Sequence, residues 1–345
     1  MRSLSFEDLK NIAQIFVSQL LKADFKNAVN KFDDQMKTVI SEDKLQESWL
    51  KIIADSGSLL NMEVKSTKEV EKYKIVIIRC NFQMNIIDIN IVFNEQGQIS
   101  GLNFIPTKIE YHPPPYIDES AFNEDEVTIG EGEWALPGTL TVPIGSGPFP
   151  GIVLVHGSGP NDKDETIGPN KIFRDIAWGL ASKSIAVLRY DKRTFKYPKK
   201  FTNALLKKFT VKEEVIDDAL LAVQLMRQIE DINPKKVFLL GHSLGATLAP
   251  RIGQKDQNLA GLIIMAGITR SLEDTILDQY TYLYGLSGTI SDEQKAELEA
   301  LKIKVNRVKD PDLSDNVQPQ DLPLGVHAAY WKDLRDNNVL DAVKH

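Results

Sequence analysis

Cysteine is almost absent from this chain, and its scarcity excludes a class of folds. The 345 residues include one cysteine, Cys80, so no disulfide can form within the chain. A small scaffold held together by disulfides is therefore excluded. Cys80 stands in an alternating apolar run, which predicts a small buried side chain.

Long apolar runs and a basic surplus are missing as well. No run of 18 apolar residues occurs, and residues 1–8 lack the apolar stretch of a signal peptide. The net charge of -7 and the pI near 5.4 argue against a nucleic-acid partner, because such proteins carry basic stripes. We interpret the locally basic residues 192–208 as a solvated loop. We expect no membrane contact and a cytoplasmic location, with a trimmed export signal left open.

Residues 1–105 are predicted to form an α+β domain. Apolar residues at helical spacing over residues 5–56 predict three short helices. The apolar period then changes to two, which predicts strands over residues 62–70, 73–82, 84–93 and 99–104. Helices followed by a curved antiparallel sheet resemble the cone-shaped nuclear-transport-factor-2-like fold. No titratable cluster marks a site in this domain.

A proline-rich segment, residues 106–122, is predicted to be a stiff linker because it contains three consecutive prolines, Pro113 to Pro115. We assign residues 123–345 to a second domain. Its buried apolar strands, at residues 151–155, 185–188, 237–240 and 262–265, alternate with helical segments. This alternation predicts an α/β fold with a doubly wound, mainly parallel sheet.

Two segments depart from this alternation. Residues 127–129 and 140–142 are predicted to pair around a turn at Leu136, Pro137 and Gly138. Residues 268–335 are polar and helical, with one helix opened by Ser291, and we interpret them as a cap over the carboxyl edge of the sheet.

The strongest chemical signal is Gly241-His242-Ser243-Leu244-Gly245, which follows the apolar strand 237–240 and precedes helical sequence. This G-x-S-x-G pattern is typical of a nucleophile elbow, a tight strand-to-helix turn that exposes the serine hydroxyl. The pattern alone recurs by chance roughly 0.1 times in a chain of this length. Its position between a strand and a helix makes Ser243 the candidate nucleophile.

A second glycine-rich turn, His156-Gly157-Ser158-Gly159-Pro160, follows the strand 151–155. The oxyanion formed in acyl transfer needs two positioned donors. We assign them to the backbone N–H groups of Leu244 and Ser158, with Gly157 as the substitute. The spacing between the two turns is expected to bring them together at one edge of the sheet.

The histidines beside these turns have structural interpretations. His156 stands in the wrong chain order for a general base, so we predict that it shapes the oxyanion turn. We also expect His156 and His242 at the pocket, with the side chains of His242 and Leu244 packing beside it. Residues 162–165 either hold the pocket mouth or form a solvated loop, and Asp191 is predicted to pair with Arg193.

Four segments together resemble the α/β-hydrolase superfamily: residues 136–140, 156–165, 189–194 and 241–245. More narrowly, they resemble bacterial serine esterases that are similar to dipeptidyl-peptidase-type hydrolases and carry an amino-terminal domain of unknown function. The resemblance implies hydrolysis of short acyl esters by a Ser-Asp-His triad, without a metal or a cofactor.

The acid and the base of such a triad are not identifiable. They should follow further buried strands after Ser243, in the order acid and then histidine. Only His327 and His345 follow Ser243, and neither follows a buried strand. The same holds for Asp310, Asp312, Asp315 and Asp321.

We therefore predict a truncated chain whose carboxyl-terminal strands are missing. A repurposed His327 and a catalytically inactive descendant remain open. The expected function is that of a serine carboxylesterase acting on a small-molecule ester through Ser243. A serine peptidase of the dipeptidyl or acylaminoacyl type and a non-catalytic binding protein are the alternatives, and the oligomeric state is open.

Overall fold

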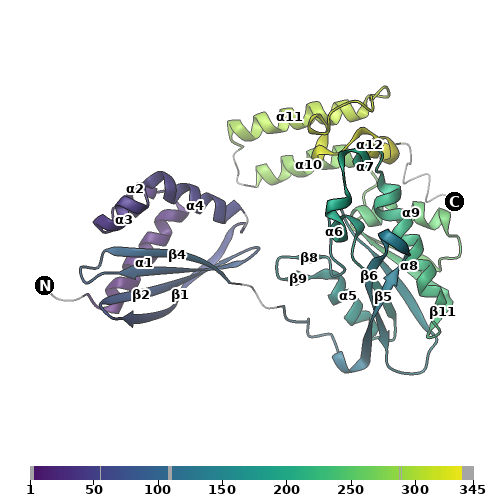
Figure 1. Ribbon diagram of the computed structural model, residues 1–345, viewed down its shortest axis with the longest axis horizontal. Coiled ribbons are helices and arrows are strands. Elements are labelled where there is room, and N and C mark those ends of the chain that lie inside the picture. The colour runs from purple at the N-terminus through teal and green to yellow at the C-terminus, as the bar shows by residue number, and fades with distance from the viewer. Residues whose placement is uncertain (1–3, 55, 108–110, 287, 289, 336–345) are drawn as a thin grey trace. The chain divides into compact units, whose positions relative to one another are not determined.

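The computed structural model describes residues 4–54, 56–107, 111–286, 288 and 290–335. The chain divides into two compact units, Met1–His112 with Ile167–Asn170, and Pro113–Thr166 with Lys171–His345. Figure 1 shows the elements of each unit. None of the described helices is long and apolar enough to cross a membrane.

The first unit contains four helices followed by four strands. The helices are α1 (Phe6–Leu21), α2 (Phe25–Val29), α3 (Asp34–Val39) and α4 (Glu42–Ala54). The strands β1 (Leu59–Val70), β2 (Tyr73–Phe82), β3 (Ile86–Phe93) and β4 (Ile99–Thr107) form an antiparallel sheet in chain order. The predicted α+β arrangement is confirmed.

The number of helices predicted for this unit was wrong. Three were expected, but the short α3 adds a fourth, and its amino end is capped by the Asp33 side chain, which accepts the Met36 N–H (2.8 Å). One face of the sheet is buried, since alternate residues of β2 are covered. Cys80 lies on that face with 0% exposure, as predicted, and burial raises the pKa of its thiol to about 12.

The second unit is built on a six-stranded sheet of order β12-β11-β7-β10-β6-β5. Its strands are β5 (Phe122–Ile129), β6 (Leu136–Pro143), β7 (Phe149–Val155), β10 (Ala186–Tyr190), β11 (Ile232–His242) and β12 (Gly261–Met265). The four strands from β12 to β10 run parallel, whereas β6 and β5 are antiparallel to their neighbours. The predicted mainly parallel sheet is confirmed.

Helices cover both faces of this sheet because its central strands are apolar on both sides. Ile152 and Leu154 of β7 pack with Phe173 of α5 (Ile172–Ala181). The alternate residues Val153 and Val155 pack in the cluster that contains α8 (Asp217–Gln228) and α9 (Leu244–Lys255). Figure 1 shows these helices around the sheet.

The cap segment contains α10 (Leu272–Gly285), α11 (Asp292–Lys309) and α12 (Ala328–Arg335). Its helices share a small core formed by Ile276, Val308, Leu313, Leu322, Ala328 and Trp331. Ser291 caps α11 as the sequence predicts, since its side chain accepts the Gln294 N–H (3.2 Å).

Short elements complete the described chain. They are β8 (Thr166–Ile167), β9 (Asn170–Lys171), α6 (Arg193–Lys196), α7 (Asn203–Leu206), a π-helical turn (Lys212–Ile216) and the 3₁₀ turns Glu119–Ala121, Gly132–Trp134, Pro198–Lys200, Pro319–Asp321 and Pro323–Gly325.

Two strand predictions in this unit need correction. Leu136, Pro137 and Gly138 are not a turn but the start of β6, where they pair with residues 127–129, and the connection lies before them. The edge strand β12 was expected to be as buried as the other parallel strands. Its apolar residues Leu262, Ile263 and Ile264 are instead 37%, 41% and 50% exposed.

Candidate active site

The turn between β11 and α9 holds Ser243 in a strained backbone conformation. Ser243 has φ 51° and ψ -111°, and it is the N-cap of α9. Its N–H donates a hydrogen bond to the carbonyl of Met265 on the neighbouring β12 (2.9 Å). Such backbone strain persists only where the surrounding structure enforces it, and it concentrates at functional sites. The strand, turn and helix expected around Ser243 are all present.

Two glycines make this turn possible because no side chain fits at either position. A Cβ on Gly241 would lie 2.3 Å from the carbonyl oxygen of Gly245. A Cβ on Gly245 would lie 2.3 Å from the carbonyl oxygen of Val155 and 2.6 Å from that of His156. The glycines therefore let α9 begin directly against the end of β7.

The turn after β7 lies beside the elbow, as the spacing predicted. β7 and β11 are parallel neighbours with Val155 opposite Gly241, so both strands end at the same edge of the sheet. A Cβ on Gly157 would lie only 3.2 Å from the Cβ of Ser243. The two glycine-rich turns thus meet around Ser243.

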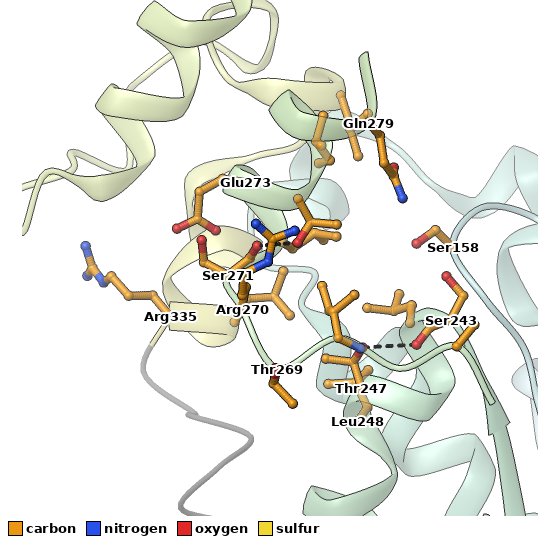
Figure 2. Close-up of a pocket in the computed structure, with 18 of the residues that line it drawn as sticks. Ser158, Ser243, Thr247, Leu248, Thr269, Arg270, Ser271, Glu273, Gln279 and Arg335 are labelled. Carbon is orange, nitrogen blue, oxygen red and sulfur yellow. Dashed lines mark hydrogen bonds between the residues drawn. The ribbon is translucent and has the colours of Figure 1, made fainter. Parts of the chain in front are cut away.

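Two backbone N–H groups near Ser243 are candidate oxyanion donors. Leu244 is the first residue of α9, where N–H groups have no intrahelical acceptor. Ser158 lines the same pocket as Ser243, and Figure 2 shows the two serine side chains next to each other. The N–H of Gly157 already donates to Oε1 of Glu165 (2.7 Å). Gly157 is therefore engaged elsewhere, and Ser158 remains the candidate.

These groups open into a pocket with a volume of about 590 Å³. Its lining combines the elbow with cap residues, including Ile276 of α10. Gln279 of the same helix is labelled in Figure 2. This volume is in the range of pockets that bind small molecules.

Three charged residues line the cap side of this pocket. Glu273 on the first turn of α10 is 8% exposed, and its carboxylate has no ion pair or hydrogen bond with any of the described residues. Arg270 pairs with Asp278 (2.5 Å), and Arg335 donates a hydrogen bond to the carbonyl of Asp310 (2.9 Å). Because Glu273 lines the pocket and carries an acidic group without a partner among the described residues, it is a candidate group for binding a cation.

His156 is buried behind the oxyanion turn. Its ring is 2% exposed and packs against Phe173 and Tyr190, and its Nε2 lies 3.0 Å from the carbonyl oxygen of Asp162. Burial, reinforced by the nearby Lys192, lowers the pKa of the imidazole to about 3. A neutral ring bonded to the loop is consistent with a structural role, but His156 is not among the residues that line the pocket, so the pocket position expected for it was wrong.

His242 lines the pocket and pairs with a buried carboxylate. Its Nδ1 lies 2.9 Å from Oε2 of Glu165. The contact does not have hydrogen-bond geometry, since both atoms lack a hydrogen-bond partner among the described residues, and it is an ion pair only when the imidazole carries a proton. Glu165 therefore contacts both turns that surround Ser243.

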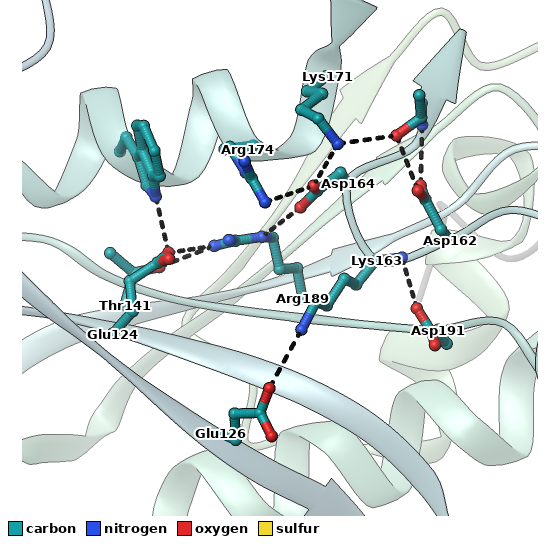
Figure 3. Close-up of polar contacts among 12 residues, drawn as sticks. Glu124, Glu126, Thr141, Asp162, Lys163, Asp164, Lys171, Arg174, Arg189 and Asp191 are labelled. Atoms are coloured by element: carbon teal, nitrogen blue, oxygen red, sulfur yellow. Dashed lines mark hydrogen bonds and ion pairs between the residues drawn. The ribbon is translucent and has the colours of Figure 1, made fainter. Parts of the chain in front are cut away.

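Residues 162–165 do not form a solvated loop, because Asp164 and Glu165 are 3% and 2% exposed. Asp164 accepts a hydrogen bond from Nε of Arg189 (3.0 Å) and pairs with Lys171 and Arg174 (2.9 and 2.8 Å) (Figure 3). Burial raises the pKa of Asp164, but these three cations outweigh it and the net shift is downward. The solvated-loop alternative was therefore wrong, whereas the contacts of Glu165 with Gly157 and His242 agree with a segment that holds the pocket mouth.

Two further expectations about charged residues were also wrong. Asp191 does not pair with Arg193: its carboxylate accepts the Lys163 N–H (2.9 Å), whereas Arg193 pairs with Asp218 on α8. Lys192, which we assigned to a solvated loop, is 2% exposed and pairs with Glu214 (2.6 Å). Side chains at the ends of buried strands turn inward here, which local composition does not reveal.

No general base for Ser243 is found in the described part of the chain. His327 is 8% exposed and is not among the residues that line the pocket, and the Ser243 hydroxyl makes no hydrogen bond to any described histidine. His345 lies outside the described residues. Within the same residues, no group of three or more His, Cys, Asp or Glu side chains is arranged to hold a metal ion.

Comparison with known proteins identifies the family. The chain is 38% identical to esterase EstD of Thermotoga maritima over 334 residues, which are 96% of this chain and 76% of EstD. The chain belongs to the α/β-hydrolase superfamily of serine esterases. Residues 13–102 of this esterase match a family of proteins of unknown function, DUF3887.

Solved structures of other hydrolases are similar at a lower level. The bacterial brefeldin A esterase is 20% identical and has a TM-score of 0.37 over 52% of this chain and 48% of its own. An acylaminoacyl peptidase is 13% identical and has a TM-score of 0.35 over 69% of this chain and 43% of its own. The family assignment therefore rests on the EstD match.

The sequence reasoning included Glu165 only in a segment with two open interpretations, and it missed two buried residues of this esterase site, Lys192 and Glu214. A signal existed for Lys192, since it is a charged residue that closely follows the buried strand β10. Glu214 carries no such signal, because it lies in a π-helical turn far from both glycine-rich turns in the sequence.

Proposed function

We propose that this esterase hydrolyses short acyl esters through an acyl-enzyme on Ser243. The observation that carries the proposal is the strained elbow at Ser243, which lies against the Gly157 turn at the mouth of a pocket of about 590 Å³. In this mechanism the Ser243 oxygen attacks the ester carbonyl, and the oxyanion accepts hydrogen bonds from the N–H groups of Leu244 and Ser158. The alcohol then leaves with a proton, and water releases the carboxylic acid from Ser243.

The proton of the Ser243 hydroxyl needs an acceptor, and no described histidine is placed to take it. A serine without its base is a poor nucleophile, and only the modest contribution of the oxyanion donors and of binding remains. That the acid and base belong to strands missing from this chain stays a prediction, as do the cytoplasmic location and the inactive-descendant alternative.

A fluorophosphonate probe tests the proposal, with the adduct mapped by mass spectrometry. The probe is applied to the 345-residue chain and to the longest form that its reading frame encodes, with Ser243→Ala as the control in each. We expect slow labelling at Ser243 in the 345-residue chain, faster labelling in a longer form that supplies a base, and none in Ser243→Ala.

Two results would contradict these expectations. Absence of any adduct on Ser243 in a form that supplies a base would reject the esterase mechanism in favour of a binding protein. Ordinary turnover of p-nitrophenyl butyrate by the 345-residue chain would contradict the prediction of a truncated chain, because the acid and base would then have to lie within these residues.

A peptidase is the second candidate, and Glu273 is the observation that favours it. An unpaired carboxylate in the pocket could bind the free amino group of a short peptide. Hydrolysis of p-nitrophenyl butyrate is compared with that of an aminoacyl p-nitroanilide, in the wild type and in Glu273→Gln. If the wild type cleaves the anilide and Glu273→Gln does not, the result supports the peptidase. If the wild type cleaves only the ester, the result supports the esterase.

A further inference from the structure

The Gly157 residue of the oxyanion turn is held from two sides by buried charges. Its N–H donates to Oε1 of Glu165 (2.7 Å), and its carbonyl accepts a hydrogen bond from Nζ of Lys192 (2.8 Å). Both side chains are 2% exposed. Asn161 also donates to the Gly157 carbonyl, at 3.3 Å, from a partly exposed position.

The Lys192 contact determines where the Ser158 N–H points. The Gly157 carbonyl and the Ser158 N–H belong to one peptide unit, which is planar and has the two groups on opposite sides. A donor that fixes the direction of the carbonyl therefore also fixes the direction of the N–H. Ser158 is the residue whose N–H we assigned to the oxyanion, so Lys192 acts on the site without reaching the pocket.

Lys192 is itself held by a chain of hydrogen bonds that begins in the cap. Its Nζ pairs with Oε1 of Glu214 (2.6 Å), and the Tyr330 hydroxyl on α12 donates to Oε2 of the same carboxylate (2.6 Å). Burial and the Glu214 carboxylate raise the pKa of Tyr330 well above its ordinary value, so its hydroxyl stays a donor. The contacts Tyr330–Glu214–Lys192 thus connect the cap to the Gly157 carbonyl.

Glu165 provides the corresponding contact on the other side. One oxygen accepts the Gly157 N–H, and the other lies 2.9 Å from Nδ1 of His242, the residue before Ser243. A single carboxylate therefore joins the turn that carries the Ser158 donor to the turn that carries the Leu244 donor. Glu165 has φ 48°, a strained conformation for a residue with a side chain.

Burying an ammonium group costs more free energy than burying an apolar side chain of the same size, even when the ammonium is paired. Packing alone therefore gives no reason for a lysine at residue 192. We infer that Lys192 and Glu165 are positioning residues, which hold the Gly157–Ser158 peptide so that the Ser158 N–H faces the developing oxyanion. The inference rests on the proposed esterase mechanism, because that mechanism gives Ser158 its role.

The test replaces Lys192 with Met, which has similar length but no donor. Because this change leaves the Glu214 carboxylate without its cation, the second variant is Lys192→Met with Glu214→Gln, which removes both charges. The matched control is Lys199→Met, an exposed lysine nearby in the sequence. Thermal unfolding of each variant shows whether it is folded.

In an active form of the chain, we expect kcat for p-nitrophenyl butyrate to fall roughly 100-fold in both Lys192 variants, the usual loss when one oxyanion donor is misplaced. KM should change by less than about threefold, since the donor acts mainly in the transition state. The double variant should recover thermal stability but not kcat. An unchanged kcat in a folded double variant would overturn the inference.

A second readout does not depend on activity. A crystal structure of the double variant should show the Gly157–Ser158 peptide turned away from its wild-type orientation. If the wild type neither turns over esters nor reacts with the fluorophosphonate, the proposed function fails, and this structure still tests the inference. A peptide that keeps its orientation without Lys192 would overturn it.

Discussion

At Ser243, the residues that shape the backbone matter as much as the hydroxyl. The serine is strained at φ 51°, and the glycines on either side of the elbow leave no room for a Cβ. The pentapeptide motif is therefore a packing requirement as well as a chemical one: it brings the amino end of α9 against the last carbonyls of β7.

Gly245→Ala tests this requirement. The new Cβ would meet backbone oxygens of Val155 and His156 rather than a flexible side chain, so the strand or the helix must shift. We expect the free energy of unfolding to fall by about 1–3 kcal/mol, as in other overpacked sites. Urea unfolding measures this loss, and labelling of Ser243 should slow at the same time.

Gly285→Ala is the matched control, because a Cβ on Gly285 at the end of α10 meets no atom within 4 Å. Alanine also favours the helix, so stability should be unchanged or slightly higher. Equal losses in the two variants would contradict the packing argument at the elbow.

His156 should make stability depend on pH. Its pKa is about 3 in the folded protein against 6.5 for the free side chain, so below pH 6.5 the unfolded chain binds more protons. Stability should therefore fall as the pH drops from about 6.5 towards 3, with a slope of up to roughly 1.4 kcal/mol per pH unit from this residue. Urea unfolding between pH 7 and pH 4 measures that slope.

The comparison variant for this experiment is His156→Gln, whose amide can donate to the Asp162 carbonyl but does not titrate. The pH dependence that remains in this variant belongs to other groups. Subtracting it from the wild-type curve isolates the contribution of His156, and identical slopes in the two proteins would show that His156 is not buried in its neutral form.

At the scale of elements, one carboxylate joins all four strands of the first unit. Asp88 of β3 accepts hydrogen bonds from Lys65 of β1 (2.5 Å), Arg79 of β2 (2.9 and 3.0 Å) and Thr107 of β4 (3.1 Å). Burial raises the pKa of Asp88, but the bonds from Arg79, Lys65 and Thr107 outweigh it and lower the pKa to about 2.

Asp88→Asn should remove a stabilising contribution that depends on pH. Because the folded-state pKa lies below the free value of 3.8, the contribution is complete above about pH 4 and is lost as the pH falls towards 2. We expect the free energy of unfolding of the wild type to exceed that of Asp88→Asn by about 2 kcal/mol at pH 7 and by much less at pH 2.5. Hydrogen–deuterium exchange of peptides from residues 73–93 across a urea series measures the difference, and a gap that stays constant with pH would contradict the prediction.

The strands of both units could be predicted from the sequence, but the pairing of their charges could not. Strand and helix periods are local, so the apolar alternation of β2 and the apolar runs of β7 and β10 were recognisable. The partner of a charged residue depends on which elements meet. Arg193 forms its ion pair with Asp218 on α8 and not with Asp191, its neighbour in the sequence. Lys192 points into the interior and pairs with Glu214.

Exposure of β12 was unpredictable for the same reason. Its sequence is as apolar as that of β7, and only the order of strands in the sheet shows that β12 lies at an edge. Around Ser243, the motif and the neighbouring glycine turn could be predicted because strand spacing determines them. The buried carboxylate and lysine that hold the glycine turn could not.

For the whole hydrolase unit, Arg189 is the central buried charge. It is 1% exposed, lies one residue before the carboxyl end of β10, and binds Asp164 in the loop after β7 (3.0 Å) and Glu124 on β5 (2.8 Å). Lys171 and Arg174 extend the same network towards α5 (Figure 3). The network thus connects the outermost antiparallel strand to the loop that carries Glu165 and, through it, to the oxyanion turn.

Arg189→Met should therefore weaken both the fold and the site. Asp164 would keep Lys171 and Arg174, but Glu124 would lose its main cation. Removing one partner of a buried ion pair typically costs about 3–5 kcal/mol, so we expect a loss of unfolding free energy up to that range. Urea unfolding followed by circular dichroism measures the loss. The control is Arg270→Met, since Arg270 and Asp278 are 64% and 58% exposed and such a pair contributes about 0–1 kcal/mol. If the free energy of unfolding of Arg189→Met falls by less than about 1 kcal/mol, the ion pairs around Arg189 do not act as a connected network. The position of Glu165 would then not depend on Arg189.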